Sequence, residues 1–471
     1  MTPQKIRTRI APSPTGPCHL GTARTALFNY LFAKHHGGTF IFRLEDTDRE
    51  RSTREFEQEL YDSLHWLGLH WDEGPDVGGD LGPYRQSERG EHYRAAIEKL
   101  LESGHAYRCF CAPGASDATS RSSSSLRSTS PCKCRERPPE DTDKPFAVRF
   151  RMPDETFTFN DLIRGEVTVE GSGIADFIIA RPNGSPIFHL SNVVDDAEMR
   201  ITHIMRGEDH LPNVPKHIAL FRALGHEPPL YAHLPLILNP DGSKMSKRKK
   251  IEGLEPYVSV FKERGYLPEA MVSYLALLGW SSGAEEEILT LDELAKRFSI
   301  EAVSKSGARF DLQKLDAFNG HYIRGLSPER FVRELKTRLP ETDNKYLEGI
   351  ARLIQERLKR FDDAKEYSGF FFVPKGHTTR GTAVMIKEVL KWLEHLPEQE
   401  FTAEILEEKM RATAEQEPYN WKARHLFMAV RVALTGSKAT PPLFETMQVL
   451  GKERCIHWLQ AALGRVDEAH D

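Results

Sequence analysis

A loop rich in proline and glycine near the amino terminus leads into the first residues that could do chemistry. The loop runs over residues 12–17, and His19 and Gly21 open the helix predicted to follow it. Backbone N–H groups at a helix start lack partners and carry the positive end of the helix dipole, so they favour a phosphate. His19 and Thr22 lie three positions apart and could donate to the same phosphate or ribose. A capping histidine with an entry glycine is the simpler interpretation of a lone His-x-Gly motif.

A basic run within residues 241–250 is the second candidate. Five of the seven residues from Lys244 to Lys250 are cationic. Gly242 and the small Ser246 let the loop bend over a polyphosphate, and lysine side chains supply mobile charges for its β and γ groups. Taken alone, such a run is typical of a solvated basic segment or an RNA-binding patch.

Two Cys-x-Cys pairs form the third candidate, and their members are Cys109, Cys111, Cys132 and Cys134. Four thiolates can hold zinc tetrahedrally in a closed structural site, so the pairs predict one Zn²⁺ per chain. The serine-rich spacer of 20 residues is a loop that this site would close at its base. The alternatives are buried free thiols and an iron–sulfur cluster, although Cys-x-Cys is not the usual ferredoxin spacing. Cys18 and Cys455 are expected to be packing residues.

Strands and helices must position these groups, and the first hundred residues alternate between the two. The patterns predict strands at 7–11 and 39–44, and helices at 23–34 and 53–67. This order indicates a parallel sheet built from βαβ units, with ligands at the carboxyl ends of its strands.

The composition changes after residue 107. A serine-rich stretch too polar for a core is followed by alternating, strand-like segments, which predicts a separate β-rich insertion at 108–186. Strand-like patterns return at residues 201–205 and 218–224. From residue 256 onward the sequence pattern is mostly typical of helices.

The overall composition fits a soluble protein of several domains. The chain has 471 residues, of which 39% are hydrophobic and 28% charged, with a net charge of −5. These values argue against a disordered chain, a membrane-spanning chain and a uniformly basic nucleic-acid binder, while local basic patches are compatible with them. The amino terminus has no apolar segment typical of a signal peptide, so we expect a cytoplasmic protein without membrane contact.

The histidine motif and the basic run, in this order and about 220 residues apart, resemble the two signatures of class I aminoacyl-tRNA synthetases. Further segments resemble the bacterial glutamyl-tRNA synthetases, and they lie at residues 9–19, 44–48, 192–196, 206–210 and 431–436. The resemblance covers nearly the whole chain. It implies an α/β fold, with a Rossmann-type parallel-sheet catalytic domain, a mixed α/β insertion and all-α C-terminal domains.

The resemblance also implies a division of the chain and a reaction. The catalytic domain would comprise residues 1–107 and 187–250, interrupted by an acceptor-stem-binding insertion at 108–186 that carries the candidate zinc site. A helical stem-contact domain at 251–330 and a helical anticodon-binding domain at 331–471 would follow. The implied reaction attaches L-glutamate to the 3′ end of tRNA(Glu) through a glutamyl-adenylate, and it releases AMP and diphosphate. Mg²⁺ would accompany ATP, and a monomer is expected.

Glutamate has two carboxylates and one ammonium, so its pocket requires two cationic groups and one anion. The resemblance gives Arg9 the side-chain carboxylate, Arg206 the α-carboxylate and Glu45 the ammonium. The set implied for glutamate is Arg9, Ala11, Ser13, Glu45, Phe188, Asn192 and Arg206. The set implied for ATP is His19, Gly21, Thr22, Glu208, Lys244, Met245, Ser246, Lys247 and Arg248, of which His19, Lys244 and Lys247 would serve catalysis. Considered singly, most of these are as well explained by surface ion pairs or satisfied polar groups.

Two positions depart from the family pattern. Thr22 replaces the second histidine of the class I signature, so one imidazole donor is absent. Phe188 lies where the family usually has tyrosine, which removes a hydroxyl contact and leaves an aromatic wall.

Two other functions fit part of the sequence. One is a paralogue that adenylates glutamate for another acceptor, but the shortened paralogues lack the C-terminal half that this chain has. The other is an inactive RNA-binding relative, against which the intact ATP loops argue. The candidate RNA contacts in the C-terminal half, each equally well explained by a solvated helix face, are Arg352, Arg357, Lys359, Arg360, Trp421, Lys422 and Arg424.

Overall fold

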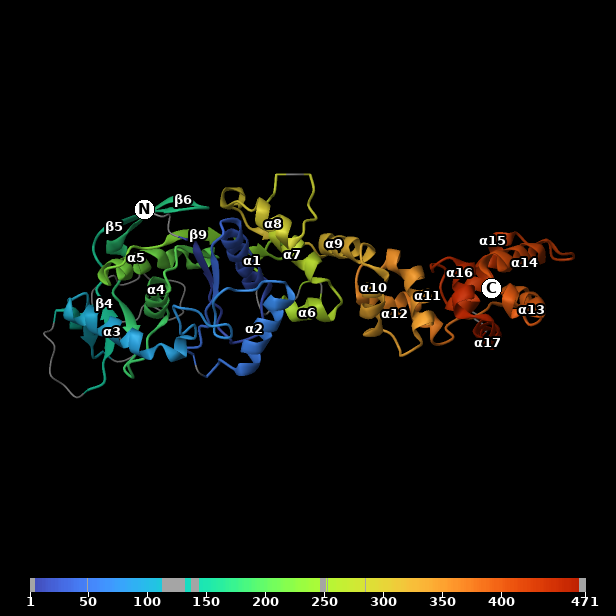
Figure 1. Ribbon diagram of the computed structural model, residues 1–471, viewed down its shortest axis with the longest axis horizontal. Helices are drawn as coiled ribbons and strands as arrows, with labels where there is room; N and C mark the ends of the chain where they lie inside the picture. Colours follow the sequence, from blue (N-terminus) through green and yellow to red (C-terminus); the bar gives the residue numbers. More distant parts are fainter. Residues whose placement is uncertain are drawn as a thin grey trace. The chain divides into compact units, whose positions relative to one another are not determined.

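The computed structural model describes residues 5–48, 50–111, 132–136, 144–245, 251, 253–283 and 285–465. The chain forms two compact units. The first contains Met1–Lys262 and Pro268–Leu312, and the second contains Glu263–Leu267 and Gln313–Asp471. Figure 1 follows the chain through both units.

Parallel strand pairs form the centre of the first unit. They are β1 (Arg7–Ile10) with β2 (Thr39–Phe42), and β8 (His203–Gly207) with β9 (Leu230–Leu234). The first two strands are connected by α1 (Leu20–His35), and β1 also contacts β8. All four residues of β2 are buried, and α1 is apolar around most of its circumference, as expected for elements covered on both sides. The predicted strand–helix–strand order is confirmed.

The predicted insertion contains two antiparallel arrangements. One is a three-stranded sheet of β3 (Ala106–Cys109), β4 (Ala147–Phe150) and β7 (Phe177–Ala180). The other is a hairpin of β5 (Thr156–Asp161) and β6 (Gly165–Glu170).

The hairpin also belongs to the sheet of the parallel strands. Asp161, the last residue of β5, pairs in parallel with Tyr231 of β9. The strand order is therefore β6-β5-β9-β8, and β9 separates the end of β5 from β8, which lines the cavity described below.

Four helices flank these strands, namely α2 (Arg54–Trp66), α3 (Gly90–Glu102), α4 (Phe188–Glu198) and α5 (Val214–Ala223). The strand-like signal at 218–224 is wrong, because these residues lie mostly in α5. A short apolar run has no periodicity that separates a buried strand from a buried helix, and Pro215 in the first turn is the overlooked helix signal.

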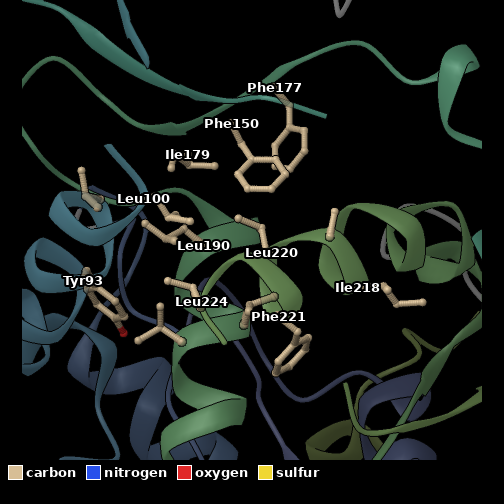
Figure 2. Close-up of a cluster of buried hydrophobic side chains, with 14 of the residues drawn as sticks. Tyr93, Leu100, Phe150, Phe177, Ile179, Leu190, Ile218, Leu220, Phe221 and Leu224 are labelled. Carbon is tan, nitrogen blue, oxygen red and sulfur yellow. The ribbon is translucent and has the colours of Figure 1, made fainter. Parts of the chain in front are cut away.

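A hydrophobic cluster joins α3, α4 and α5 to the insertion. Figure 2 shows Leu100, Leu190 and Leu220 from the three helices close to Phe150 of β4 and Phe177 of β7. Fully burying a side chain of this size stabilises the fold by about 1.5–3 kcal/mol. The cluster therefore fixes α4, which carries Phe188 and Asn192 at the cavity.

Smaller elements complete the first unit. They are β10 (Ile237–Leu238) paired in parallel with β11 (Ala308–Arg309), and the helices α6 (Val258–Glu263), α7 (Pro268–Leu277) and α8 (Leu291–Arg297). Helix α8 begins with a capping box of Thr290 and Glu293, which satisfies its first N–H groups.

The described residues of the second unit form helices and turns without strands. Its α-helices are α9 (Leu312–Arg324), α10 (Pro328–Lys336), α11 (Asn344–Ile354), α12 (Ala364–Ser368), α13 (Arg380–Leu393), α14 (Ala403–Glu415), α15 (Ala423–Thr435), α16 (Leu443–Leu450) and α17 (Lys452–Leu463). The expected α/β fold with an all-α C-terminal region is thus confirmed. Within the described part of the chain, no helix is both long enough and apolar enough to cross a membrane.

Candidate active site

A cavity of about 650 Å³ opens in the first unit where β1, α1, α4 and β8 meet. Most of the residues predicted for glutamate and ATP line it, namely Arg9, Ala11, Ser13, His19, Gly21, Thr22, Glu45, Phe188, Asn192, Arg206, Lys244 and Met245. Ser246, Lys247 and Arg248 lie outside the described residues. Glu208 is described but is not among the lining residues.

His19 begins α1 as its N-cap. Its ring nitrogen Nδ1 accepts a hydrogen bond from the N–H of Gly21 at 3.1 Å, so Nε2 carries the proton of the neutral ring. The backbone on both sides is held by the segment after the basic run: Leu20 donates to the carbonyl of Pro256 at 2.9 Å, and Val258 donates to that of Cys18 at 2.9 Å. His19 therefore caps α1 and lines the cavity at the same time.

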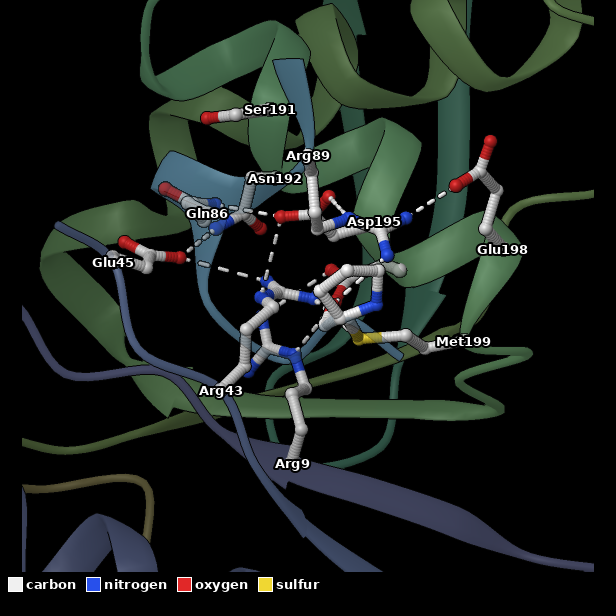
Figure 3. Close-up of polar contacts among 12 residues, drawn as sticks. Arg9, Arg43, Glu45, Gln86, Arg89, Ser191, Asn192, Asp195, Glu198 and Met199 are labelled. Carbon is white, nitrogen blue, oxygen red and sulfur yellow. Dashed lines mark hydrogen bonds and ion pairs between the residues drawn. The ribbon is translucent and has the colours of Figure 1, made fainter. Parts of the chain in front are cut away.

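Arg9, at the end of β1, belongs to a buried network of charges. Its Nε lies 3.1 Å from Asp196 Oδ1, and the same oxygen lies 2.6 Å from Arg43 (Figure 3). Burial alone would raise the pKa of Asp196, but Arg43 and Arg9 hold it below its ordinary value. The neighbouring Asp195 anchors the network to Arg89, with 2.6 Å between their nearest atoms. Carboxylates thus fix the Arg9 guanidinium from one side.

Glu45 lies at the edge of this network and faces α4. Its Oε1 accepts a hydrogen bond from the amide of Asn192 at 2.6 Å and lies 3.5 Å from Arg43. Burial raises the pKa of the Glu45 carboxyl, although Arg43 and Arg9 oppose this shift. The side-chain oxygen of Asn192 is buried and has no hydrogen-bond partner among the described residues. A cation here would gain two acceptors and stabilise the ionised carboxylate.

Arg206, at the end of β8, has a different environment. It is 6% exposed, and within the described residues it forms no ion pair with a carboxylate. Its Nε donates to Nε2 of His233 at 3.3 Å, and one terminal nitrogen lies 3.5 Å from Nδ1 of His217. The other terminal nitrogen donates to the carbonyl of His210 at 3.4 Å. Burial lowers the pKa of Arg206 to about 10, with Arg9 adding to the shift. The site thus contains a desolvated cation that a ligand carboxylate would stabilise.

The ring of Phe188 forms an aromatic wall beside the histidines. Its centroid lies 5.6 Å from that of His210 and 5.8 Å from that of His217. Phe188 therefore lines the cavity, and its ring offers no hydroxyl group there.

Two neighbouring acidic residues near β8 have different partners. Glu208 accepts from the N–H of Leu236 at 2.9 Å and forms an ion pair with Arg164. It therefore fixes the backbone at Leu236, which lines the cavity. Asp209 lines the cavity and lies 3.4 Å from Nζ of Lys244, in a pair with both side chains at least half exposed. The sequence analysis had placed Glu208, and not Asp209, in the set for ATP.

Arg24 of α1 is a further cavity residue that the sequence analysis missed. It is 3% exposed and donates to the carbonyls of Leu278, at 2.9 Å, and Pro235. Its charge also has no carboxylate within ion-pair distance in the described ranges. An arginine within an apolar helix gives no sequence signal for such a position.

The four predicted cysteine ligands come together. The sulfur atoms of Cys109, Cys111, Cys132 and Cys134 all lie within 4.8 Å of one another. Three of the sulfur pairs are 3.6 Å apart. Four ligands at zinc–thiolate distance in a tetrahedron would be separated by roughly 3.8 Å, so the donor set and its spacing fit this metal.

The candidate RNA contacts in the second unit differ in their exposure and in the contacts that they already make. Arg352 and Arg357 are exposed, whereas Arg360 lies 3.3 Å from Asp363 in an ion pair. The ring of Trp421 stacks on that of Tyr419 with 4.4 Å between centroids. An exposed arginine and a stacked aromatic pair are compatible with RNA, whereas Arg360 is already engaged.

Comparisons with known proteins identify the family to which this chain is similar. Residues 5–317 match the family described as "tRNA synthetases class I (E and Q), catalytic domain", and residues 330–463 match "Anticodon binding domain". The glutamate–tRNA ligase 1 of Syntrophomonas wolfei is 41% identical, with 97% of this chain and 96% of that protein covered. A glutamate–tRNA ligase of Dehalococcoides mccartyi is 42% identical, with 98% of each covered. The crystal structure of a glutamate tRNA ligase from Elizabethkingia meningosepticum in complex with its amino acid has a TM-score of 0.85 and 34% identity, covering 98% of this chain and 100% of that one.

Proposed function

This chain belongs to the class I tRNA synthetases for glutamate and glutamine, among the glutamate–tRNA ligases, and we propose that its cavity holds glutamate beside ATP. The enzyme attaches L-glutamate to the 3′ end of tRNA(Glu) in two steps, through a glutamyl-adenylate, and releases AMP and diphosphate. The observation that supports the cavity as the reaction site is its charge pattern. Arg9, Arg206 and Glu45 line one cavity and complement two carboxylates and one ammonium.

Within the pocket, Arg9 takes the side-chain carboxylate of glutamate and Arg206 takes its α-carboxylate. Glu45 and the side-chain oxygen of Asn192 receive the ammonium. Ala11, Ser13 and Phe188 complete the walls. Neither step of the reaction requires a protein nucleophile, because the substrate carboxylate attacks ATP and the tRNA ribose attacks the adenylate. Orientation and charge neutralisation therefore supply most of the rate.

ATP occupies the part of the cavity around the start of α1. His19, Gly21 and Thr22 line this part of the cavity, where the positive end of the helix dipole favours the phosphates, and Lys244 and Met245 line the same cavity. We assign Ser246, Lys247 and Arg248 to the same phosphates on the basis of the sequence, with Lys247 the main cation. Mg²⁺ bound with ATP would neutralise charge on the phosphate oxygens.

Further assignments concern the metal, the RNA and the cell. The four cysteines hold one structural Zn²⁺, which would fasten the ends of the serine-rich loop within the insertion. Residues 108–186 contact the acceptor stem, residues 251–330 form the stem-contact domain, and residues 331–471 contact the anticodon. The enzyme is a cytoplasmic monomer without membrane contact.

Elemental analysis of protein prepared without chelator should find about one zinc per chain, and iron or no metal would contradict the zinc assignment.

ATP–pyrophosphate exchange, measured with and without tRNA, tests the proposed function. We expect glutamate-dependent exchange and transfer of labelled glutamate to tRNA(Glu). Exchange without charging of any tRNA would indicate a paralogue with another acceptor. RNA binding without exchange would indicate an inactive relative.

A further inference from the structure

Arg206 is oriented by imidazoles, and one of these imidazoles has its own carboxylate. His233 lies between Arg206 and Asp161, and all three side chains are at most 6% exposed. We propose that Asp161 and His233 are positioning residues for glutamate: Asp161 sets the tautomer of His233, and His233 sets the orientation of the Arg206 guanidinium. This inference rests on the proposed role of Arg206 in binding a carboxylate of glutamate.

The protons in this series of contacts follow from the chemistry of the groups. A carboxylate only accepts, so the 2.6 Å contact between Nδ1 of His233 and Oδ2 of Asp161 requires the proton on Nδ1. A guanidinium only donates, so Nε2 of His233 accepts from Nε of Arg206 at 3.3 Å. Both contacts require the same tautomer, and each therefore supports the other.

The backbone holds the Asp161 carboxylate in a fixed orientation. Its other oxygen, Oδ1, accepts from the N–H groups of Ile163 at 3.1 Å, Arg164 at 2.9 Å and His233 at 3.2 Å. Burial would raise the pKa of Asp161, but the hydrogen bonds from His233 and Arg164 hold it below its ordinary value. Only Oδ2 is directed at the imidazole. Rotation of the carboxylate would break three backbone hydrogen bonds.

Neutral imidazoles explain how Arg206 is held without losing its charge. Burial lowers the pKa of His233, although Asp161 opposes this shift, and the pKa of His217 is lowered well below its ordinary value by burial and by Arg206. Nδ1 of His217 is the second acceptor for Arg206, and Nε2 of His217 lies 3.1 Å from Nδ1 of His189. The third acceptor, the backbone carbonyl of His210 at 3.4 Å, is also uncharged. A carboxylate in either position would neutralise the guanidinium and compete with the substrate. Histidine fixes the geometry and leaves the full positive charge for glutamate.

The substitution Asp161→Asn tests the tautomer directly. The three backbone donors require an oxygen at the Oδ1 position, so the new amide must direct its NH₂ group at Nδ1 of His233. Nδ1 then has to accept, the proton moves to Nε2, and two N–H groups oppose each other between His233 and Arg206. We expect the KM for glutamate to rise about 10- to 100-fold. The KM for ATP should change little. The melting temperature should fall modestly, because the opposed N–H groups are buried, although the side-chain volume is preserved.

A double-mutant cycle distinguishes a tautomer effect from a general structural effect. His233→Gln places an amide oxygen near the former Nε2 and has no tautomer, so it should keep an acceptor for Arg206. In the His233→Gln background, Asp161→Asn should therefore leave the glutamate KM unchanged. An equal rise in both backgrounds would show that Asp161 acts without the histidine proton and would overturn the proposal.

A second variant guards against poor folding of the first. His233→Asn keeps a donor near Asp161 and removes only the acceptor for Arg206, so it should raise the glutamate KM more than His233→Gln does. Arg206→Gln is measured alongside. If Arg206→Gln raises the glutamate KM while Asp161→Asn and His233→Asn do not, the positioning proposal fails and the assignment of Arg206 stands. If Arg206→Gln itself leaves the glutamate KM unchanged, the proposed function of the pocket fails as well.

Discussion

The two arginines of the glutamate pocket are held by opposite means. On the Arg9 wall, guanidiniums and carboxylates alternate, and Asp196 is shared between Arg9 and Arg43. On the Arg206 wall, the acceptors carry no charge: they are the neutral rings of His217 and His233 and the backbone carbonyl of His210. Both arginines are nearly fully buried, with 4% and 6% of their surface exposed.

The difference shows that a buried arginine can be held in a fixed orientation either with or without neutralisation of its charge. Paired carboxylates hold Arg9 firmly but offset its charge, and removing one of them leaves uncompensated cations in the interior. Neutral imidazoles orient Arg206 through weaker hydrogen bonds and leave its charge in place. The Arg9 wall is therefore the more important of the two for folding, and the Arg206 wall the more sensitive in substrate binding.

The largest expected effect is that of Asp196→Asn on stability. The substitution removes the shared negative charge from a buried group, and breaking such a pair typically costs about 3–5 kcal/mol. Urea unfolding should detect a loss of this size, and much of the variant should be insoluble or unfolded at 37 °C. Asp48→Asn is the matched control because Asp48 pairs with Arg51 at the surface, and it should unfold like the parent protein. Equal stability of the two variants would contradict this account of the Arg9 wall.

The histidines of the Arg206 wall and Asp196 of the Arg9 wall should respond to acid in different pH ranges. Burial lowers the pKa of His189 and that of His210 to about 4, from an ordinary value of 6.5. Because the unfolded chain binds protons at these histidines first, their contribution to stability is complete above pH 6.5 and falls as the pH drops toward 4. The pKa of Asp196 is lowered from 3.8, so its contribution is lost only below that pH.

Thermal unfolding between pH 7 and pH 4 measures this difference. The melting temperature should fall with the pH, by an amount that reflects about 1.4 kcal/mol for each unit of pKa shift. His189→Gln should make the fall shallower, since it removes one of the titrating groups. If the parent protein and the variant have the same pH dependence, the histidines of the Arg206 wall are not neutral in the folded protein.

The smallest expected effect concerns the exposed pair of Asp209 and Lys244. Both side chains are at least half exposed, so the pair is worth less than about 1 kcal/mol. Asp209→Asn should change the KM for ATP by at most about fivefold and should leave the KM for glutamate unchanged. A large change in the glutamate KM would place Asp209 on the amino-acid side of the cavity.

Local patterns were enough to predict much of the fold. The βαβ order, the strands of the insertion and the helical C-terminal half follow from periodicity and from turn residues, and they agree with the structure. Among the segments that were predicted, the exception is α5, because a short run that is buried on all sides has no distinguishing period. No pattern had indicated α3, α4 or β9. The cysteine pairs were recognisable because two ligands lie within three residues of each other in each pair.

The partners of the site residues could not be predicted in the same way. Arg9 and Asp196 are 187 positions apart, and Asp161 and His233 are 72 apart. No local spacing connects such residues, and only the packing of α4 and of the β5–β6 hairpin against the parallel strands brings them together. For the same reason, the sequence did not reveal that Glu208, predicted for ATP, pairs with Arg164 and accepts from a backbone N–H.

The division of work between the two arginines is the central claim, and amino-acid selectivity tests it most directly. Arg9→Gln and Arg206→Gln are each assayed for kcat/KM with glutamate and with glutamine. A hydrogen bond to a charged group is worth about 1.5–3 kcal/mol, so each loss should be roughly 10- to 150-fold. We predict that Arg9→Gln lowers kcat/KM for glutamate and narrows the gap to glutamine, while Arg206→Gln lowers both values alike because both substrates share the α-carboxylate. A changed glutamate-to-glutamine ratio in Arg206→Gln, with an unchanged ratio in Arg9→Gln, would contradict the assignment.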